Sequence, residues 1–311
     1  MSILVAADFT PAEWAEWLHA LSRAMPGETL LPGRGAAAPD AIDIAIVAKP
    51  AAGALAGLPR LRLIQSLWAG VEALLADPTV PADVPLARMV DPAMNEAMAE
   101  TALWAVLSLQ RRCFDYARQQ RETRWAPHRQ RRAGEFAVTV LGLGEMGRAV
   151  ALRLARNGYR VCGWSARQST LPGVRTLAGD AALPAALADA QAALNLLPLT
   201  PATQGLIDAR LLALLPRGAS VVNLARGAHL VEADLLAALA SGHLRHAVLD
   251  VFSTEPLPAT HPFWSNQQVT VLPHVAAQTD AGSASAVVAA NVAALRAARP
   301  LRHLVDRSRG Y

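Results

Sequence analysis

The sequence predicts an α/β protein built from two doubly wound parallel sheets, and three observations support this fold class. The chain has 311 residues, and at roughly 100 to 200 residues per domain this length favours two domains. The composition is 53% apolar and 17% charged, which supplies buried cores and excludes a disordered chain. Short apolar runs alternate with longer helical patterns, as they do in successive βαβ units.

The amino-terminal part of the chain begins this alternation. A short apolar strand is expected at residues 3–7. Thr10, Pro11 and Glu13 then combine a capping box with a proline in the first turn of a helix. Further apolar runs predict buried strands at 42–48, 61–67 and 85–90. These elements predict a small first α/β lobe.

The pattern changes near residues 91–95, where we expect a domain boundary. A long helical pattern covers residues 94–119, and a second series of apolar strand cores follows. The strands of this series are expected at 136–141, 159–165, 192–197, 220–224, 246–252 and 269–272. Their short connections favour a second doubly wound sheet. A last helix is predicted at 280–298, with the tail returning to the first lobe.

Two helix ends within the second lobe carry recognisable signals. Asp208 is expected to cap a helix at 209–215, because its carboxylate can accept hydrogen bonds from the first free amides. Gly242 is expected to close a helix that begins near residue 232, because glycine readily adopts the left-handed conformation of a helix end.

The composition also indicates where the protein is located and which partners are excluded. No stretch reaches about 18 uninterrupted apolar residues, so we expect no transmembrane helix and no membrane partner. The first ten residues contain Asp8 and lack a basic lead-in, so we expect no signal peptide and a cytoplasmic protein. Two cysteines, Cys113 and Cys162, cannot form a disulfide framework and are expected to be core thiols.

The chain is basic, with 29 basic and 25 acidic residues, but only Lys49 is a lysine. Schiff-base chemistry would therefore depend on a single residue at the end of an expected strand. One local arginine cluster, at 121–132, contains Trp125 and could grip phosphates. We expect a solvated arm or a subunit contact there instead, and no nucleic-acid partner. No spacing of histidines and carboxylates indicates a metal site.

A glycine loop is the first stretch with specific chemistry. Gly142, Gly144 and Gly147 follow an apolar strand directly and open a helical segment, which is the context that a dinucleotide-binding loop requires. The first glycine permits the tight turn, the second lets backbone approach a pyrophosphate, and the third allows close helix packing. Amides at the helix start favour bound anions, so a dinucleotide cofactor is expected.

The end of the next strand indicates which dinucleotide is preferred. Sites that prefer NAD place an Asp or Glu there, where it accepts hydrogen bonds from the adenine ribose. This chain has Ser165 followed by Arg167. The absence of a carboxylate removes repulsion toward a 2′-phosphate, and a guanidinium binds phosphate through a fork of donors. We therefore expect NADPH, with NADH as a weaker cofactor.

Three later stretches follow the ends of predicted strands, and they contain Arg226, Glu255 and His274. Ligands of open α/β sheets bind at this edge, so the three side chains are expected in one crevice. Here the sequence resembles the D-isomer-specific 2-hydroxyacid dehydrogenases, whose cofactor domain carries these stretches in this order after a glycine loop. The segment 195–208 resembles another stretch of that family, and the likeness covers nearly the whole chain.

The resemblance implies a domain arrangement. It predicts a Rossmann cofactor domain at 94–279, inserted into a flavodoxin-like substrate domain. The first part of that substrate domain is 1–93, and a C-terminal helix and tail at 280–311 complete it. Residues 162–165, 223–229 and 305–311 resemble the members of the family that reduce glyoxylate and hydroxypyruvate.

The resemblance also assigns roles to residues. It makes Arg226 the substrate-binding arginine, His274 the proton donor and Glu255 the carboxylate partner of that histidine. The cofactor-binding residues that it implies are Gly142, Gly144, Glu145, Met146, Gly147, Ser165, Arg167, Leu197, Pro198 and Asp250. In the first lobe, it implies that the backbone amides of Ala69, Gly70 and Val71 hold the substrate carboxylate. Further candidate pocket residues are Trp68, Arg88, Met94 and Trp125.

Elementary chemistry agrees with these roles. Hydride delivery to a 2-oxo acid places negative charge on the carbonyl oxygen, so an acid must protonate that oxygen. His274 can do so near neutral pH, and an adjacent carboxylate favours the protonated ring. Arg226 can bind the substrate carboxylate and polarise the ketone with a permanently charged donor fork.

We therefore expect NADPH-dependent reduction of small 2-oxo acids, from glyoxylate to glycolate and from hydroxypyruvate to D-glycerate. The alternatives are another D-2-hydroxyacid dehydrogenase and a dinucleotide-sensing interaction protein on the same fold. The long helix from residue 94 and the arm through residue 132 resemble the dimer-forming elements of the family, so a homodimer is expected.

Overall fold

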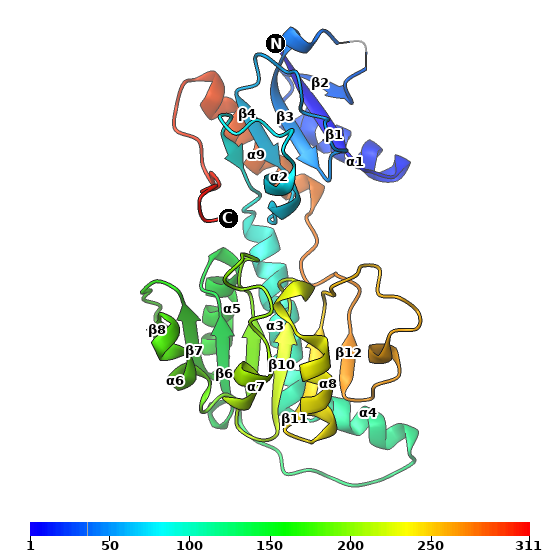
Figure 1. The fold of residues 1–311 in the computed structure, drawn as a ribbon, viewed down its shortest axis with the longest axis vertical. Helices are drawn as coiled ribbons and strands as arrows, with labels where there is room; N and C mark the ends of the chain where they lie inside the picture. The colour runs from blue at the N-terminus through cyan, green and yellow to red at the C-terminus, as the bar shows by residue number, and fades with distance from the viewer. Residues whose placement is uncertain (36) are drawn as a thin grey trace. The chain divides into compact units, whose positions relative to one another are not determined.

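The computed structural model describes residues 1–35 and 37–311, and it divides into two compact units (Figure 1). The first unit consists of Met1–Met94 and Thr279–Tyr311, and the second of Asn95–Gln278. Both chain termini therefore belong to the first unit. Within the described ranges, no helix is long and apolar enough to cross a membrane.

The first unit contains a five-stranded parallel sheet with the order β2-β1-β3-β4-β5. The strands are β1 (Ser2–Ala7), β2 (Thr29–Pro32), β3 (Ile42–Ala48), β4 (Leu63–Ser66) and β5 (Leu86–Ala87). This is the flavodoxin-like order. Every residue of the central strand β3 is buried, as expected of a strand covered on both faces.

The helices of the first unit come from both ends of the chain. They are α1 (Pro11–Ala24), α2 (Glu72–Ala76) and α9 (Ala281–Arg296), and α1 packs against α9. The predicted capping box is present, because Glu13 Oε2 accepts from the Thr10 N–H at 2.8 Å and Thr10 Oγ1 accepts from the Glu13 N–H at 3.3 Å. The tail returns to β5, where the Val305 N–H donates to the Leu86 carbonyl oxygen at 2.8 Å.

The second unit contains a seven-stranded parallel sheet with the order β12-β11-β10-β9-β6-β7-β8. Its strands are β6 (Ala137–Leu141), β7 (Arg160–Ser165), β8 (Arg175–Ala178), β9 (Ala192–Asn195), β10 (Ala219–Asn223), β11 (Leu244–Leu249) and β12 (Val269–Val271). Counted from β6, six strands follow the Rossmann order, and β12 extends the sheet by one strand.

Helices cover both faces of this second sheet. They are α3 (Pro92–Gln110), α4 (Cys113–Arg121), α5 (Glu145–Arg156), α6 (Leu183–Leu187), α7 (Ala209–Ala213) and α8 (Glu232–Ala240). One buried cluster joins the sheet to α3 and α5, and another joins it to α6, α7 and α8. Five short 3₁₀ turns complete the described elements: Pro39–Ala41, Ala133–Glu135, Asp180–Ala182, Gly227–His229 and Pro262–Trp264.

The carboxyl ends of six strands in the second sheet lie in one row. Backbone pairing aligns Trp164 with Leu141, Leu141 with Asn195, Asn195 with Asn223, Asn223 with Leu249 and Leu249 with Val271. The glycine loop begins directly after this row, and Arg226, Asp250 and His274 follow it within three residues. The sheet therefore gathers them along one edge.

The predicted fold class is confirmed, but β2 and β8 were missed by the sequence patterns. Both are edge strands, and neither contains a fully buried residue, so neither shows the apolar run that marks a central strand. The helix predicted at 94–119 is two helices, because Arg112 adopts a left-handed conformation with φ of 62° between α3 and α4.

The expectation of two core thiols is wrong for Cys113. This residue is exposed at the first position of α4, whereas Cys162 is partly buried in β7. The helix break at Arg112 starts a new helix with a polar sequence, so its first residue does not face the core.

Candidate active site

The glycine loop between β6 and α5 has the geometry that its three glycines predict. Gly142 has φ of +97°, and a Cβ there would lie 2.7 Å from the Leu196 carbonyl oxygen. A Cβ on Gly147 would overlap the Gly142 carbonyl group, so only glycine allows α5 to pack this closely. A Cβ on Gly144 would meet no atom within 4 Å, which leaves the backbone there open to a ligand. These residues fit a bound pyrophosphate.

The end of β7 carries arginine rather than a carboxylate. Ser165 Oγ donates to the Arg167 carbonyl oxygen at 2.6 Å and thereby holds the turn that presents the Arg167 side chain. Arg148 reaches the same turn from α5, where its Nη1 donates to Ser169 Oγ at 3.3 Å. A second guanidinium, which sequence reasoning missed, therefore contacts the segment that follows Arg167.

Arg226 follows β10 in a loop held by buried amide side chains. Asn223 Nδ2 donates to the Arg226 carbonyl oxygen at 2.9 Å, and Asn195 Nδ2 donates to Asn223 Oδ1 at 3.0 Å. The Arg226 guanidinium donates to the Ala225 carbonyl oxygen at 2.6 Å. A Cβ on the next residue, Gly227, would overlap the Phe252 backbone, so glycine is required directly after the arginine.

His229 completes the support of the Arg226 loop. Its ring is fully buried, with Nε2 3.2 Å from the Pro198 carbonyl oxygen and Nδ1 2.9 Å from Asn195 Nδ2. Nδ1 also lies 3.2 Å from the Arg226 carbonyl oxygen, so each ring nitrogen has a carbonyl acceptor within reach. His229 therefore joins the loop that follows β9 to the loop that follows β10.

His274 and Glu255 form a direct pair. The His274 Nδ1 lies 2.7 Å from Glu255 Oε2, while Glu255 Oε1 accepts the Phe252 N–H at 2.9 Å. Because a carboxylate accepts hydrogen bonds, Nδ1 carries a proton and Nε2 is the ring atom left to exchange one with a ligand. The His274 side chain is 53% exposed within the described chain, so a small molecule can reach it.

Asp250 holds the turn that carries His274. Its carboxylate accepts from the Val275 N–H at 2.8 Å and from the Ala276 N–H at 3.0 Å, while its carbonyl accepts the His274 N–H at 2.9 Å. His274 has φ of 55°, a left-handed conformation that these contacts stabilise. Burial raises the pKa of Asp250, and the two amides oppose that shift. The contacts of Asp250 are thus those of a positioning residue.

The loop after β4 in the first unit presents open backbone amides. Ser66 Oγ donates to the Trp68 carbonyl oxygen and accepts the Trp68 N–H, both at 3.0 Å. The Trp68 ring packs edge-on against Phe9 and Trp17, with centroids 6.3 Å and 6.1 Å away. The backbone amides of residues 69–71 donate to no acceptor within 1–35 and 37–311, which suits them to an anion.

The structure brings some predicted site residues into contact and leaves others apart. Glu255 contacts His274, the Asp250 carboxylate holds the turn that carries His274, and Pro198 contacts His229 behind Arg226. Arg226 shares the carboxyl edge of the sheet with the Glu255 and His274 pair. Of the further candidates, Met94 is 4% exposed and Trp125 is 97% exposed.

Sequence reasoning gave no site role to Asn195, Asn223 or His229. Their signal was polarity at the end of an otherwise apolar strand or in the loop that follows it, where a buried amide or imidazole requires a partner. The partner comes from another strand in each case, so only the folded chain identifies it. Among residues 1–35 and 37–311, no group of three or more histidine, cysteine or acidic side chains could hold a metal ion.

Comparison with known proteins adds the family. Residues 103–276 match the model of the D-isomer specific 2-hydroxyacid dehydrogenase, NAD binding domain. Glyoxylate/hydroxypyruvate reductase A from Yersinia enterocolitica is 39% identical to this chain over 316 residues, covering 100% of each protein.

Two solved structures are similar over the full length. A D-isomer specific 2-hydroxyacid dehydrogenase from Xanthobacter autotrophicus, in complex with NADPH and MES, is 41% identical with a TM-score of 0.95, covering 100% of this chain and 99% of that one. An NADPH-dependent glyoxylate/hydroxypyruvate reductase from Sinorhizobium meliloti, in complex with NADP and sulfate, is 35% identical with a TM-score of 0.93 and covers 100% of both. This chain therefore belongs to the D-isomer specific 2-hydroxyacid dehydrogenase family.

Proposed function

We propose that this enzyme is an NADPH-dependent reductase of small 2-oxo acids, converting glyoxylate to glycolate and hydroxypyruvate to D-glycerate. The observation that carries the proposal is the 2.7 Å contact between His274 and Glu255, at the same sheet edge as the glycine loop and Arg226. An acid, a cation and a dinucleotide loop at one edge are the groups that carbonyl reduction needs.

The two units have different roles in this proposal. The second unit binds the cofactor, and the first unit, completed by α9 and the tail, binds the substrate. The open amides of residues 69–71 donate hydrogen bonds to a carboxylate of the substrate, and Arg226 binds the substrate and polarises the ketone. The cage of Asn195, Asn223 and His229 supports this role, because it fixes the backbone from which the guanidinium extends.

His274 supplies the proton of the reaction. Glu255 holds Nδ1, so the Nε2–H of the protonated ring donates to the substrate carbonyl oxygen as negative charge develops there. The balanced reaction consumes one 2-oxo acid, one NADPH and one proton, and yields one 2-hydroxy acid and one NADP⁺. Asp250 keeps the His274 turn in place through the amides of residues 275 and 276.

NADPH is the proposed cofactor, and when bound it supplies a hydride to the carbonyl carbon. Gly142, Gly144 and Gly147 would hold its pyrophosphate, with the backbone of Glu145 and Met146 at the start of α5. Arg167 would hold the 2′-phosphate, and Ser165, Leu197 and Pro198 would line the adjacent cofactor groove. The NADPH and NADP bound in the two similar structures support this choice.

Substrate profiling tests the proposal. The purified enzyme is mixed with NADPH and a panel of 2-oxo acids, and the near-ultraviolet absorbance of the reduced nicotinamide is followed. We expect rapid NADPH oxidation with glyoxylate and hydroxypyruvate, and slower oxidation with NADH. Preference for a larger 2-oxo acid would assign another dehydrogenase activity, and binding of NADPH without turnover would indicate a dinucleotide sensor.

We also propose a homodimer formed by α3 and the arm through residue 132. Apolar side chains exposed on these segments support it, namely Trp104 (41%), Leu107 (46%) and Trp125 (97%). Sedimentation at micromolar concentration is expected to give twice the chain mass of 32.8 kDa. A species of single-chain mass alone would contradict the dimer.

A further inference from the structure

A cavity of about 640 Å³ lies at the amino-terminal ends of the strands in the second unit. Its lining includes Phe136, Arg160, Gln191, Ala219 and Gln268, which begin or directly precede β6, β7, β9, β10 and β12. Strands of five residues are about 17 Å long, so this cavity is separate from the edge that carries Arg226 and His274. Its volume is in the range of small-molecule sites, roughly 300 to 1,000 Å³.

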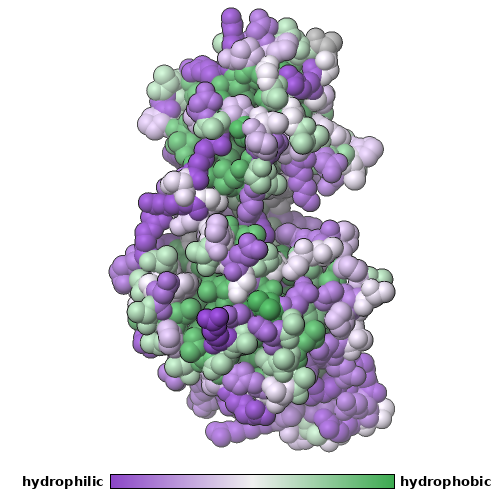
Figure 2. Space-filling model, in the orientation of Figure 1, coloured by the Kyte–Doolittle hydropathy of each residue, from purple (hydrophilic) through white to green (hydrophobic). Residues whose placement is uncertain are grey.

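The lining of this cavity is strongly cationic. It contains seven arginines, 112, 118, 129, 131, 160, 217 and 245, and three acidic residues, 115, 135 and 189. Figure 2 shows hydrophilic side chains gathered at the end of the second unit where Figure 1 places α4. We propose that this cavity binds a small anion carrying two or more phosphate groups, which no part of the proposed reductase mechanism requires.

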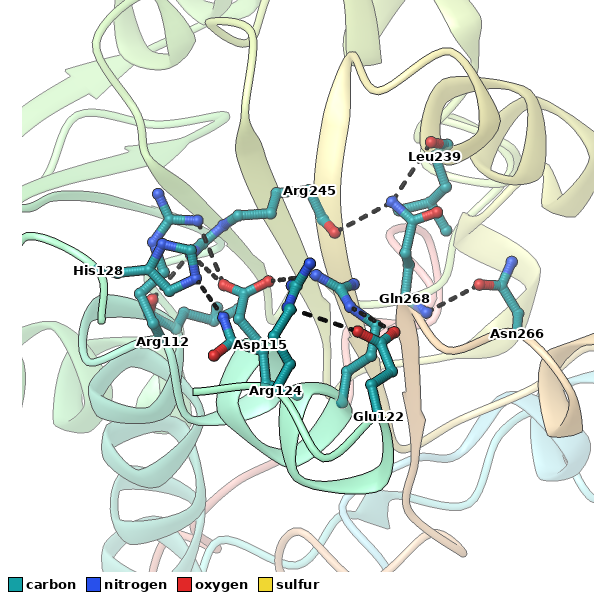
Figure 3. A network of polar contacts seen from close by, with 12 residues as sticks. Arg112, Asp115, Glu122, Arg124, His128, Leu239, Arg245, Asn266 and Gln268 are labelled. Atoms are coloured by element: carbon teal, nitrogen blue, oxygen red, sulfur yellow. Dashed lines mark hydrogen bonds and ion pairs between the residues drawn. The ribbon is translucent and has the colours of Figure 1, made fainter. Parts of the chain in front are cut away.

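Asp115 is the carboxylate at the centre of the arginine group. It accepts from Arg112 at 3.2 Å, from Arg118 at 3.1 Å and from Arg245 at 3.3 Å. Figure 3 shows Asp115 beside Arg112 and Arg245, whose guanidinium groups both contact its Oδ2. One carboxylate shared by three guanidiniums leaves the group with excess positive charge, so a further anion would be stabilised there.

Arg245 has a donor that the protein leaves unsatisfied. Its Nη2 donates to the Leu109 carbonyl oxygen at 2.9 Å and its Nη1 contacts Asp115, but its buried Nε has no acceptor within the described ranges. Burial, reinforced by neighbouring Arg112, lowers the pKa of Arg245 to about 10. A buried donor without a partner is costly, so the protein leaves the charge of Arg245 incompletely compensated.

Three further lining arginines have no partner of their own in the described part of the chain. The side chains of Arg129, Arg131 and Arg160 are exposed and form no hydrogen bond or ion pair within residues 1–35 and 37–311. Arginines at such an edge commonly bind the last carbonyls of helices, as Arg217 does with Ser241 at 3.0 Å. That explanation covers Arg217 but not the other three. Guanidinium forks match phosphate oxygens bidentately, whereas isolated lysines act as point charges.

Calorimetric titration of the full chain tests this proposal. Inorganic pyrophosphate and ADP are titrated separately at constant ionic strength, and each is expected to bind saturably. Equal affinities would show that the cavity recognises phosphates alone, and tighter binding of ADP would show that the nucleoside contributes. The test variant is Arg160→Ala, because this exposed lining side chain lies outside the arm assigned to the dimer. The control is Arg210→Ala, which removes the same charge from an exposed position outside the cavity.

The test variant should raise the dissociation constant for pyrophosphate about tenfold, since one charged contact is lost. The control variant should bind like the parent, and both variants should keep the parent's melting temperature and reductase rate. Pyrophosphate bound at the glycine loop would be unaffected by the test variant. Unchanged affinity in that variant, or no saturable binding to the parent, would overturn the proposal.

Discussion

The two edges of the seven-stranded sheet differ in how their charged groups are satisfied. At the carboxyl edge Glu255 and Asp250 have specific partners on neighbouring loops, and these contacts fix His274. At the amino edge, Asp115 serves three arginines and the Nε of Arg245 has no acceptor in the described chain. The carboxyl edge is therefore preorganised for chemistry. At the amino edge, the positive charge of the arginines exceeds the negative charge of the neighbouring acidic residues, so this edge is suited to binding an anion.

A large effect is expected at the carboxyl edge, from Arg226→Ala. Loss of the guanidinium removes substrate binding and ketone polarisation together, so kcat/KM for glyoxylate should fall about 1,000-fold. Arg226→Lys should recover part of the rate, because it keeps the charge but loses the fork. Arg210→Ala, at a side chain 96% exposed, serves as the control in the same steady-state assay. A change below threefold in Arg226→Ala would remove this residue from the mechanism.

A second prediction concerns His246 in β11, near the amino edge. Burial, reinforced by Arg245, lowers the pKa of the His246 ring to about 4. The unfolded chain therefore takes up a proton near pH 6.5 while the folded one does not, so this residue stabilises the fold above pH 6.5. That stability, on the order of 3 kcal/mol, should be lost as pH falls from 6.5 toward 4.

Urea unfolding of the parent and of His246→Leu, measured across this pH range, checks the second prediction. The parent's free energy of unfolding should fall more steeply with acid than that of the variant, which has no ring to titrate at this position. Equal slopes in the two proteins would show that His246 is protonated equally in the folded and unfolded states.

Asp250→Asn tests the support of the catalytic turn. An amide nitrogen cannot accept, so one of the two N–H groups at residues 275 and 276 loses its partner. A loosened His274 turn should lower kcat about tenfold while KM for glyoxylate changes little. Asp189→Asn, at an exposed carboxylate, is the matched control. Equal losses in kcat and melting temperature for both variants would contradict a positioning role.

An effect confined to cofactor binding is expected from Arg167→Ala. Removing one phosphate-binding fork should raise KM for NADPH about tenfold and leave KM for NADH unchanged. NADH serves as the internal control because it lacks the 2′-phosphate. A parallel rise in both constants would mean that Arg167 supports the loop rather than the phosphate.

Much of the fold was predictable because its determinants are local. The apolar runs of the central strands and the capping signals at Thr10 and Asp208 act within a few residues, and the structure contains each of them. The edge strands β2 and β8 escaped because half-exposed strands have mixed composition.

The sequence predicted only those parts of the site that lie in short, continuous motifs. Arg226, Glu255 and His274 stand out in short stretches, whereas the His229 cage forms between residues more than 30 positions apart. The arginine cavity was not predicted for the same reason. Its lining is drawn from residues 109 to 268, and only the close approach of the strand ends assembles it.

The role of His274 as proton donor is tested most directly by steady-state kinetics of His274→Gln with NADPH and glyoxylate. Glutamine keeps a hydrogen-bonding side chain but cannot deliver a proton, so kcat should fall about 100- to 10,000-fold while NADPH binding stays normal. The exposed His19→Gln provides the control. Turnover within about threefold of the parent would contradict the role assigned to the His274 and Glu255 pair.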